Sequence, residues 1–337
     1  MSEPETATAP TSPRLVRIAA SWLFGLLLTV AAAIITVQLV NANLYGPQQP
    51  VRDYFQALQD GDGERAIGLL RANLPNASPA LLDGDALKQS AAGISDIHVG
   101  NPTTLNGGRV KISVSYQLDG QPQNTDFTLE PAGVQWMFFN KWAFVPTTLP
   151  TLEVSIVNQD QAQINGTAVS MPSGKNTFSV LYPGKYQAEY QGKLFTAQPI
   201  SASFASASSA PSPLALTTEP SKALVDQVND SLKKYLDGCT TQKVLLPTDC
   251  PLSHHSVQEV SGPITWSITD YPKATISAYN GGWVISPLKV KARIQYKEQD
   301  LGTGAYSNID QEQEYGFTAK LSINGDSVSV TPVVDYS

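Results

Sequence analysis

The sequence predicts an α+β protein in which a single N-terminal transmembrane helix precedes domains built from helices and antiparallel meanders. Three observations predict this class. An uncharged apolar run lies near the N-terminus, and helical apolar spacing then gives way to alternating, strand-like spacing, an order that occurs twice. Between the two occurrences, short strand signals and frequent turns predict a small all-β module.

The apolar run covers residues 18–40 and contains no charged residue. A helix of this length spans about 34 Å, which is enough for a hydrocarbon core of about 30 Å. Trp22 and Tyr45 lie near its two ends, where aromatic side chains suit the membrane interface. We therefore expect a transmembrane anchor over 14–42, preceded by a disordered tail over 1–13 that is rich in Pro, Thr, Ala and Glu.

The flanking charges predict the orientation of this helix. Arg14 and Arg17 precede the run, and the next basic residue is Arg52. The positive-inside rule then places the N-terminus in the cytoplasm and the C-terminal bulk outside the cell membrane. A cleaved signal peptide is the alternative, with a loose cleavage match at 40–42, but its apolar region would be shorter. Both interpretations place the bulk of the chain outside.

The first α+β domain is expected over 47–149. Val51, Tyr54, Phe55 and Leu58 have the spacing of one apolar helix face. Further helices are expected at 64–70 and 79–89. Strands are then expected at 110–116 and around 127–129, and two more within 135–145 with a tight turn near 140–141.

The remaining chain divides into three parts. A small β module is expected over 150–200, with Asn165-Gly166 as a hairpin turn. Residues 201–217 are rich in Ser, Ala and Pro and predict a linker, although Ser and Ala alternate there as in an edge strand. A second α+β domain covers 218–337, with Ser221 capping a helix that stops at Gly238. Its strands are expected at 264–268, 275–279, 283–285, 290–296, 315–321 and 328–333.

Several runs resemble domains of bacterial extracytoplasmic proteins. PQQPVRDYFQALQDGDGERAIGLL and the later FTLE and QWMFFNKWAFV resemble the opening and the closing strands of NTF2-like (cystatin-like) domains. INGTAVSMPSGKNTFSVLYPGKYQAEY is similar to small β modules of envelope proteins, and KKYLDGCTTQKVLLPTDCPL to a cysteine loop in membrane-anchored proteins of Gram-positive bacteria that have no assigned function. The resemblance implies a cone-shaped fold that can hold a ligand, dimerise or do neither, and it transfers no catalytic residue.

If the first domain forms such a cone, aromatic side chains are the candidates to line it. They would allow the protein to sense a small apolar or envelope-derived ligand. The candidates are Phe55, Tyr116, Phe127, Trp136 and Phe138.

Cys239 and Cys250 are expected to form a disulfide, because two cysteines outside the membrane pair by default. A metal site that adds His254 and His255 is the alternative. That spacing matches no common zinc pattern, and adjacent histidines rarely bind one ion together.

Other catalytic or metal-binding patterns are weak. Asp60 to Glu64 resembles a calcium loop but lacks the glycine and the glutamate that such loops need at positions six and twelve. His98 has no visible partner, and the chain contains no G-x-S-x-G, P-loop or H-E-x-x-H motif. We therefore expect no cofactor, no metal site and no catalytic residue.

Charge narrows the class of partner. The chain has 22 basic and 29 acidic side chains, a net charge of −7, which argues against nucleic-acid binding.

The function predicted from the sequence is that of a non-enzymatic scaffold or protein-interaction ectodomain at the cell envelope. The lipid bilayer would hold it, and it would bind an unknown envelope partner or small ligand. The alternatives are a ligand sensor that uses the cone and, less favoured, a cone-fold isomerase or hydrolase. Such an enzyme would need an Asp–His pair, for which His98 is the one histidine before residue 150, or an Asp–Tyr pair in the cavity.

Overall fold

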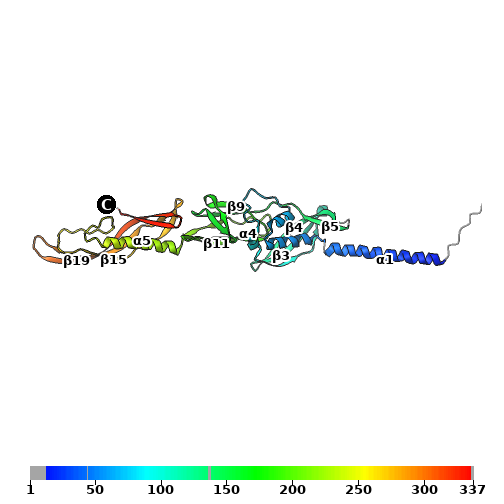
Figure 1. The fold of residues 1–337 in the computed structure, drawn as a ribbon, viewed down its shortest axis with the longest axis horizontal. Coiled ribbons are helices and arrows are strands. Elements are labelled where there is room, and N and C mark those ends of the chain that lie inside the picture. The colour runs from blue at the N-terminus through cyan, green and yellow to red at the C-terminus, as the bar shows by residue number, and fades with distance from the viewer. Residues whose placement is uncertain (1–12, 44, 136–137, 335–337) are drawn as a thin grey trace, which may run out of the picture.

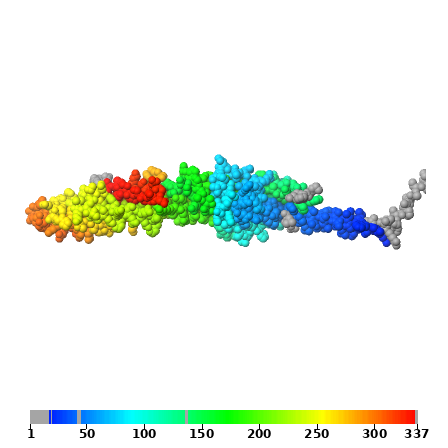
Figure 2. All heavy atoms as spheres, viewed as in Figure 1, coloured from blue at the N-terminus to red at the C-terminus, as the bar shows by residue number. Residues whose placement is uncertain are grey.

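The molecule is a rod with one long helix projecting from one end (Figure 1). The computed structural model describes residues 13–43, 45–135 and 138–334, so Trp136 and residues 1–12 of the tail expected over 1–13 lie outside the described residues. Three modules follow the helix along the long axis, and the space-filling view shows them in contact end to end (Figure 2).

Helix α1 (Pro13–Asn43) contains a window, Ala20–Val40, that is long and apolar enough to cross a membrane. Its mean hydropathy is 2.4, and none of the window is buried within the protein. Hydroxyls of Ser21, Thr29 and Thr36 donate to backbone carbonyls of the same helix at 2.8 Å. These polar groups are therefore satisfied without water, as a bilayer requires.

The first module packs α2 and α3 on an antiparallel sheet of order β1-β3-β4-β5, with β2 paired to β3, and α4 packs against α2 and β10 (Gly184–Gln191). As expected, Asp60 to Glu64 forms a turn between helices. Gly61 adopts a left-handed conformation at the end of α2, and Asp62 accepts a bond from the Arg65 N–H to cap α3. A Cβ at Gly63 would lie 1.9 Å from the Leu82 carbonyl oxygen, so glycine is needed there. The elements are α2 (Gln48–Asp60), α3 (Gly63–Leu70), α4 (Gly84–Ala91), β1 (Ile94–Val99), β2 (Thr103–Thr104), η1 (Asn106–Gly108), β3 (Val110–Leu118), β4 (Gln121–Gln135) and β5 (Phe139–Phe144).

The expected turn near 140–141 is wrong. Gln135 pairs with Phe139 across the hairpin, and Asn140 and Lys141 lie within β5 (Phe139–Phe144), so the chain reverses before the position that the aromatic pattern predicts. A bulge between Pro131 and Val134, with Gly133 at a φ of 97°, redirects the end of β4.

The second module is all-β and has two sheets, of order β13-β11-β10-β7-β8 and β12-β6-β9. Asn165 and Gly166 both have positive φ, and Ile164 pairs with Thr167, which identifies the two-residue I′ turn that the sequence predicts. Its elements are β6 (Thr151–Ile156), β7 (Gln161–Ile164), β8 (Thr167–Ser170), η2 (Pro172–Gly174), β9 (Lys175–Ser179), β10 (Gly184–Gln191), β11 (Phe195–Phe204), β12 (Leu214–Leu216) and β13 (Thr218–Pro220).

Much of the expected linker over 201–217 belongs to this module. Residues 201–204 complete β11, and β12 pairs in parallel with β6. Ala202, Phe204, Leu214 and Leu216 are buried. The alternating Ser and Ala residues of 201–203 belong to a strand in which the small Ala202 side chain points inward. Composition alone does not distinguish such a strand from a flexible linker.

The third module packs α5 (Lys222–Thr240) against a sheet of order β14-β18-β19-β20, with β15 also paired to β18. Ser221 caps α5 by accepting from the Leu224 N–H, as expected. The helix does not stop at Gly238 but runs to Thr240, because glycine tolerates helical as well as left-handed geometry. The strands are β14 (Glu259–Val260), β15 (Thr265–Asp270), β16 (Ile276–Tyr279), β17 (Gly282–Ile285), β18 (Leu288–Gln299), β19 (Tyr306–Asn324) and β20 (Ser327–Val333).

Two hydrophobic cores join the three modules. One core is continuous through the first and second modules. The other fills the third module and includes Leu194 and Phe195 of the second. Phe195 stacks on Trp283 with ring centroids 4.1 Å apart, and the Asn158 side chain donates to the Gly282 carbonyl at 2.9 Å. Each junction is therefore a packed interface.

Cys239 and Cys250 form the expected disulfide, with their Cα atoms 5.8 Å apart. Replacing both with serine removes a loop closure worth about 3 kcal/mol. We expect the free energy of unfolding of the core of the third module to fall by about that amount, read as lost hydrogen-exchange protection in β18. The matched control is Thr241→Ser with Thr248→Ser in the same loop. Equal loss of protection in β3 of the first module would contradict the separation of the two cores.

Buried tyrosines make the first core sensitive to alkali. Burial raises the pKa of Tyr182 and of Tyr186 to about 12, and it raises the pKa of Tyr54 well above its ordinary value. Because these groups titrate near 10 when unfolded, their contribution to stability is complete below about pH 10 and is lost as the pH rises toward 12. We expect this core to unfold in that window, with a coincident rise in tyrosinate absorbance. Titration of all 13 tyrosines near pH 10 with unchanged near-ultraviolet circular dichroism would contradict this.

Candidate functional site

The aromatic residues expected to line a cone form a filled core instead. Phe55, Tyr116 and Phe127 are almost completely buried, with ring centroids 5.9 Å (Phe55–Tyr116) and 6.1 Å (Phe55–Phe127) apart. Tyr54 and Phe144 pack against Phe127 at 5.7 and 5.5 Å. The space between α2 and the sheet is therefore occupied by side chains.

The other two candidates do not join this cluster. Trp136 lies outside the described residues, and Phe138 is 58% exposed at the end of the β4–β5 hairpin. Sequence spacing predicts that an aromatic residue belongs to a strand region, but it does not distinguish a strand centre from a hairpin end.

His98 lines a shallow surface groove of about 420 Å³ between α2 and β1. The imidazole is exposed, and no carboxylate is among the described residues that line the groove. The acid–base pair that an isomerase or hydrolase needs is therefore not brought together here. The lining residues are Arg52, Phe55, Gln56, Gln59, Ile97, His98 and Val99.

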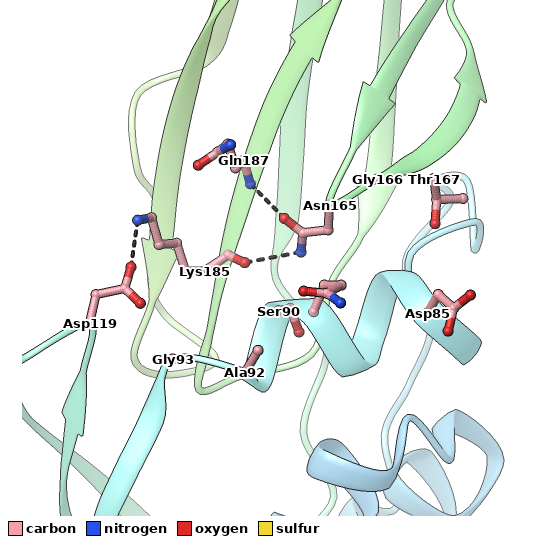
Figure 3. Close-up of a pocket in the computed structure, with 11 residues that line it drawn as sticks. Asp85, Ser90, Ala92, Gly93, Asp119, Asn165, Gly166, Thr167, Lys185 and Gln187 are labelled. Atoms are coloured by element: carbon pink, nitrogen blue, oxygen red, sulfur yellow. Dashed lines mark hydrogen bonds and ion pairs between the residues drawn. The ribbon is translucent and has the colours of Figure 1, made fainter.

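A polar groove of about 640 Å³ lies where the first module meets the second (Figure 3). Helix α4 forms one wall, and β10 with the β7–β8 turn forms the other. Lys185 and Asp119 form an ion pair across it at 2.5 Å. Both side chains are partly exposed, so this pair contributes at most about 1 kcal/mol.

Asn165 holds the two walls of this groove together. Its Nδ2 group donates to the carbonyls of Ala86 in α4 (3.2 Å) and Lys185 in β10 (3.1 Å), and its Oδ1 accepts from the Gln187 N–H (2.8 Å). Figure 3 shows the Asn165 amide between β10 and α4. The side chains of Asp119, Lys185 and Asn165 therefore bond across the groove or to its walls, and this arrangement is that of a junction rather than of a nucleophile with its base.

A second polar cluster, not predicted from the sequence, lies in the third module. His254 Nε2 is 3.0 Å from the Tyr296 hydroxyl, which donates to Glu298 at 3.2 Å, and Ser256 donates to the same carboxylate at 2.9 Å. Burial, with the charge of Glu298 beside it, raises the pKa of Tyr296 and keeps it a donor. Ser256 bonds Glu298 rather than His254, so the cluster is not a triad.

The alternative of a zinc site formed by the two cysteines and the two histidines is excluded by the disulfide. Both thiols are consumed by the disulfide, so neither Cys239 nor Cys250 is available as a thiolate ligand. No group of three or more His, Cys, Asp or Glu side chains placed to hold an ion occurs within 13–43, 45–135 and 138–334.

Comparison of the chain with protein-family models, with curated proteins and with solved structures finds no match. Any function proposed for the chain therefore rests on its own sequence and structure.

The side chain of Asn165 is expected to stabilise the junction between the first two modules. Asn165→Gly keeps a residue suited to the I′ turn but leaves the Ala86 and Lys185 carbonyls without this donor, so we expect a loss of about 2 kcal/mol in the free energy of unfolding. The matched control is Asn280→Gly, since Asn280-Gly281 makes the same kind of turn between β16 and β17 and is exposed. Denaturant titration measures both variants. An equal loss in the free energy of unfolding of both variants would show that Asn165 stabilises only the turn and not the junction.

Proposed function

We propose that the chain is a single-pass membrane protein whose extracytoplasmic part is a non-enzymatic scaffold or protein-interaction rod at the cell envelope. The observation that carries the proposal is the arrangement of three modules packed in series behind one apolar helix (Figure 1). Such a rod displays its far end at a fixed distance from the anchor. The first module is proposed to be a variant of the NTF2-like fold.

Two further observations support the membrane assignment and its orientation. Most large apolar side chains of the Ala20–Val40 window are exposed, including Leu23, Phe24 and Leu27 at 59–64%, which favours lipid as their surroundings. The disulfide favours an oxidising compartment for the C-terminal bulk. This agrees with the orientation inferred from Arg14 and Arg17.

The far end of the rod offers an open sheet edge for a protein partner. Among the described residues, 306–317 of β19 pair with β18 alone, because β20 pairs only with 318–324. Asp310, Glu312 and Glu314 alternate along this edge and are exposed. A partner strand with basic residues at alternate positions would be complementary to this edge. Basic residues of β18 on the other side of β19 form the same kind of pair, Arg293 with Asp310 and Lys289 with Glu314.

The observations favour this role over the two alternatives. A ligand sensor that uses the cone needs open space where Phe55, Tyr116 and Phe127 are packed. An isomerase or hydrolase needs an acid beside His98, and the groove there has no carboxylate among its described lining residues.

Protease added to intact cells tests the topology. We expect digestion of the C-terminal bulk and survival of a small fragment that contains α1, because the bulk faces outward. Digestion of the bulk only after permeabilisation would overturn the orientation. A chain released from membranes by alkaline carbonate would overturn the anchor itself.

Photo-cross-linking tests the open edge of β19. A benzophenone amino acid in place of Glu312 is expected to capture a partner on intact cells, and the same group at the exposed Asp230 of α5 is the control. Reversing the edge charge with Asp310→Lys and Glu314→Lys should abolish the product. A product of equal yield at both positions, or one insensitive to charge reversal, would count against a strand-pairing partner.

A further inference from the structure

The end of the β4–β5 hairpin carries apolar side chains on its surface. Val134 is 62% exposed and Phe138 58% exposed. Val134 pairs with Asn140, and the bulge at Gly133 immediately precedes it, so the redirected strand presents these side chains outward rather than to the core. Exposed apolar groups that are neighbours on one hairpin mark an interaction surface more often than isolated ones do.

This hairpin end lies next to the membrane-spanning helix. Phe139, the first residue of β5, stacks on Tyr45 with ring centroids 4.5 Å apart and an interplanar angle of 16°. Tyr45 in turn donates its N–H to the carbonyl of Val40, the last residue of the apolar window. Figure 1 shows β5 at the end of the rod from which α1 projects. The hairpin end is therefore at the level where the helix leaves the hydrocarbon.

We propose that Val134, Phe138 and Phe139 insert into the headgroup–acyl boundary of the same membrane that α1 spans. The inference rests on the proposed function, because it needs α1 in a bilayer. Aromatic side chains are favoured at this depth, where ring faces meet acyl chains. Lys141, exposed on the same hairpin, is suited to contact lipid phosphates.

Insertion gives the rod a second attachment to the membrane. A single helix followed by a short connection leaves the rod free to tilt about that connection. The stacked Tyr45 and Phe139 rings couple the helix exit to β5, and a lipid-embedded hairpin end beside them restricts the tilt. The far edge of β19 is then held away from the lipid surface.

Immersion depth can be measured on the full chain reconstituted into phosphatidylglycerol/phosphatidylethanolamine nanodiscs. A nitroxide is attached to Val134→Cys, with the native disulfide left oxidised. Two reference labels are used: Leu28→Cys within α1, and Leu301→Cys, an apolar residue that is 70% exposed at the far end of the rod. Collision rates with oxygen, which concentrates in lipid, are compared with those of a water-soluble nickel complex.

The expected result is that the Val134 label collides more often with oxygen than with nickel, as the Leu28 label does, whereas the Leu301 label shows the reverse. In the Val134-labelled chain, Phe138→Asp should shift the ratio toward nickel, while hydrogen-exchange protection of β3 confirms an intact fold. If the Val134 label collides more often with nickel, as the Leu301 label does, while the Leu28 label collides more often with oxygen, the hairpin insertion is overturned. The transmembrane assignment of α1 is then unaffected. A Leu28 label that behaves like Leu301 would overturn both.

Discussion

The hydroxyl of Tyr54 donates to the carbonyl of Tyr182 inside the first core, and much of the architecture depends on this contact. Tyr54 belongs to α2, and Tyr182 lies 128 residues later in the second module. The Tyr182 ring also stacks on Phe127 of β4, so a helix, a sheet and the next module share one cluster. Because a buried hydroxyl or carbonyl without a partner costs free energy, α2 cannot pack on its sheet without also fixing the second module.

That constraint explains why the rod is continuous. The second module is small and would bury little apolar surface alone, but its strands complete a core that the first module begins. Thr125 adds a second, partly buried link by donating from β4 to the Ala205 carbonyl at 2.6 Å. No buried side-chain nitrogen or oxygen among the described residues lacks a hydrogen-bond partner, so the junctions carry polar contacts without an unpaired group.

The sequence predicts the local features well and the long-range ones poorly. Ser221, the Asn165-Gly166 turn and the cysteine pair were predictable because their chemistry is local. Strand β1 was missed, because a register shift between Ser95 and His98 breaks its alternation. In the candidate groove, Asn165 was predictable as a turn residue. Its bond to Ala86, 79 positions away, was not, because no local pattern encodes that partner.

The same reasoning bears on function. An apolar residue in the sequence predicts a side chain removed from water, but it does not show whether protein or lipid surrounds that side chain. Phe127 and Phe138 look alike in the sequence, yet one lies in a filled core and the other is exposed on the β4–β5 hairpin. A molecule whose first module is filled has little interior to offer a ligand. The surfaces proposed for interaction accordingly lie at the two ends of the rod, the apolar hairpin end next to α1 and the charged edge of β19.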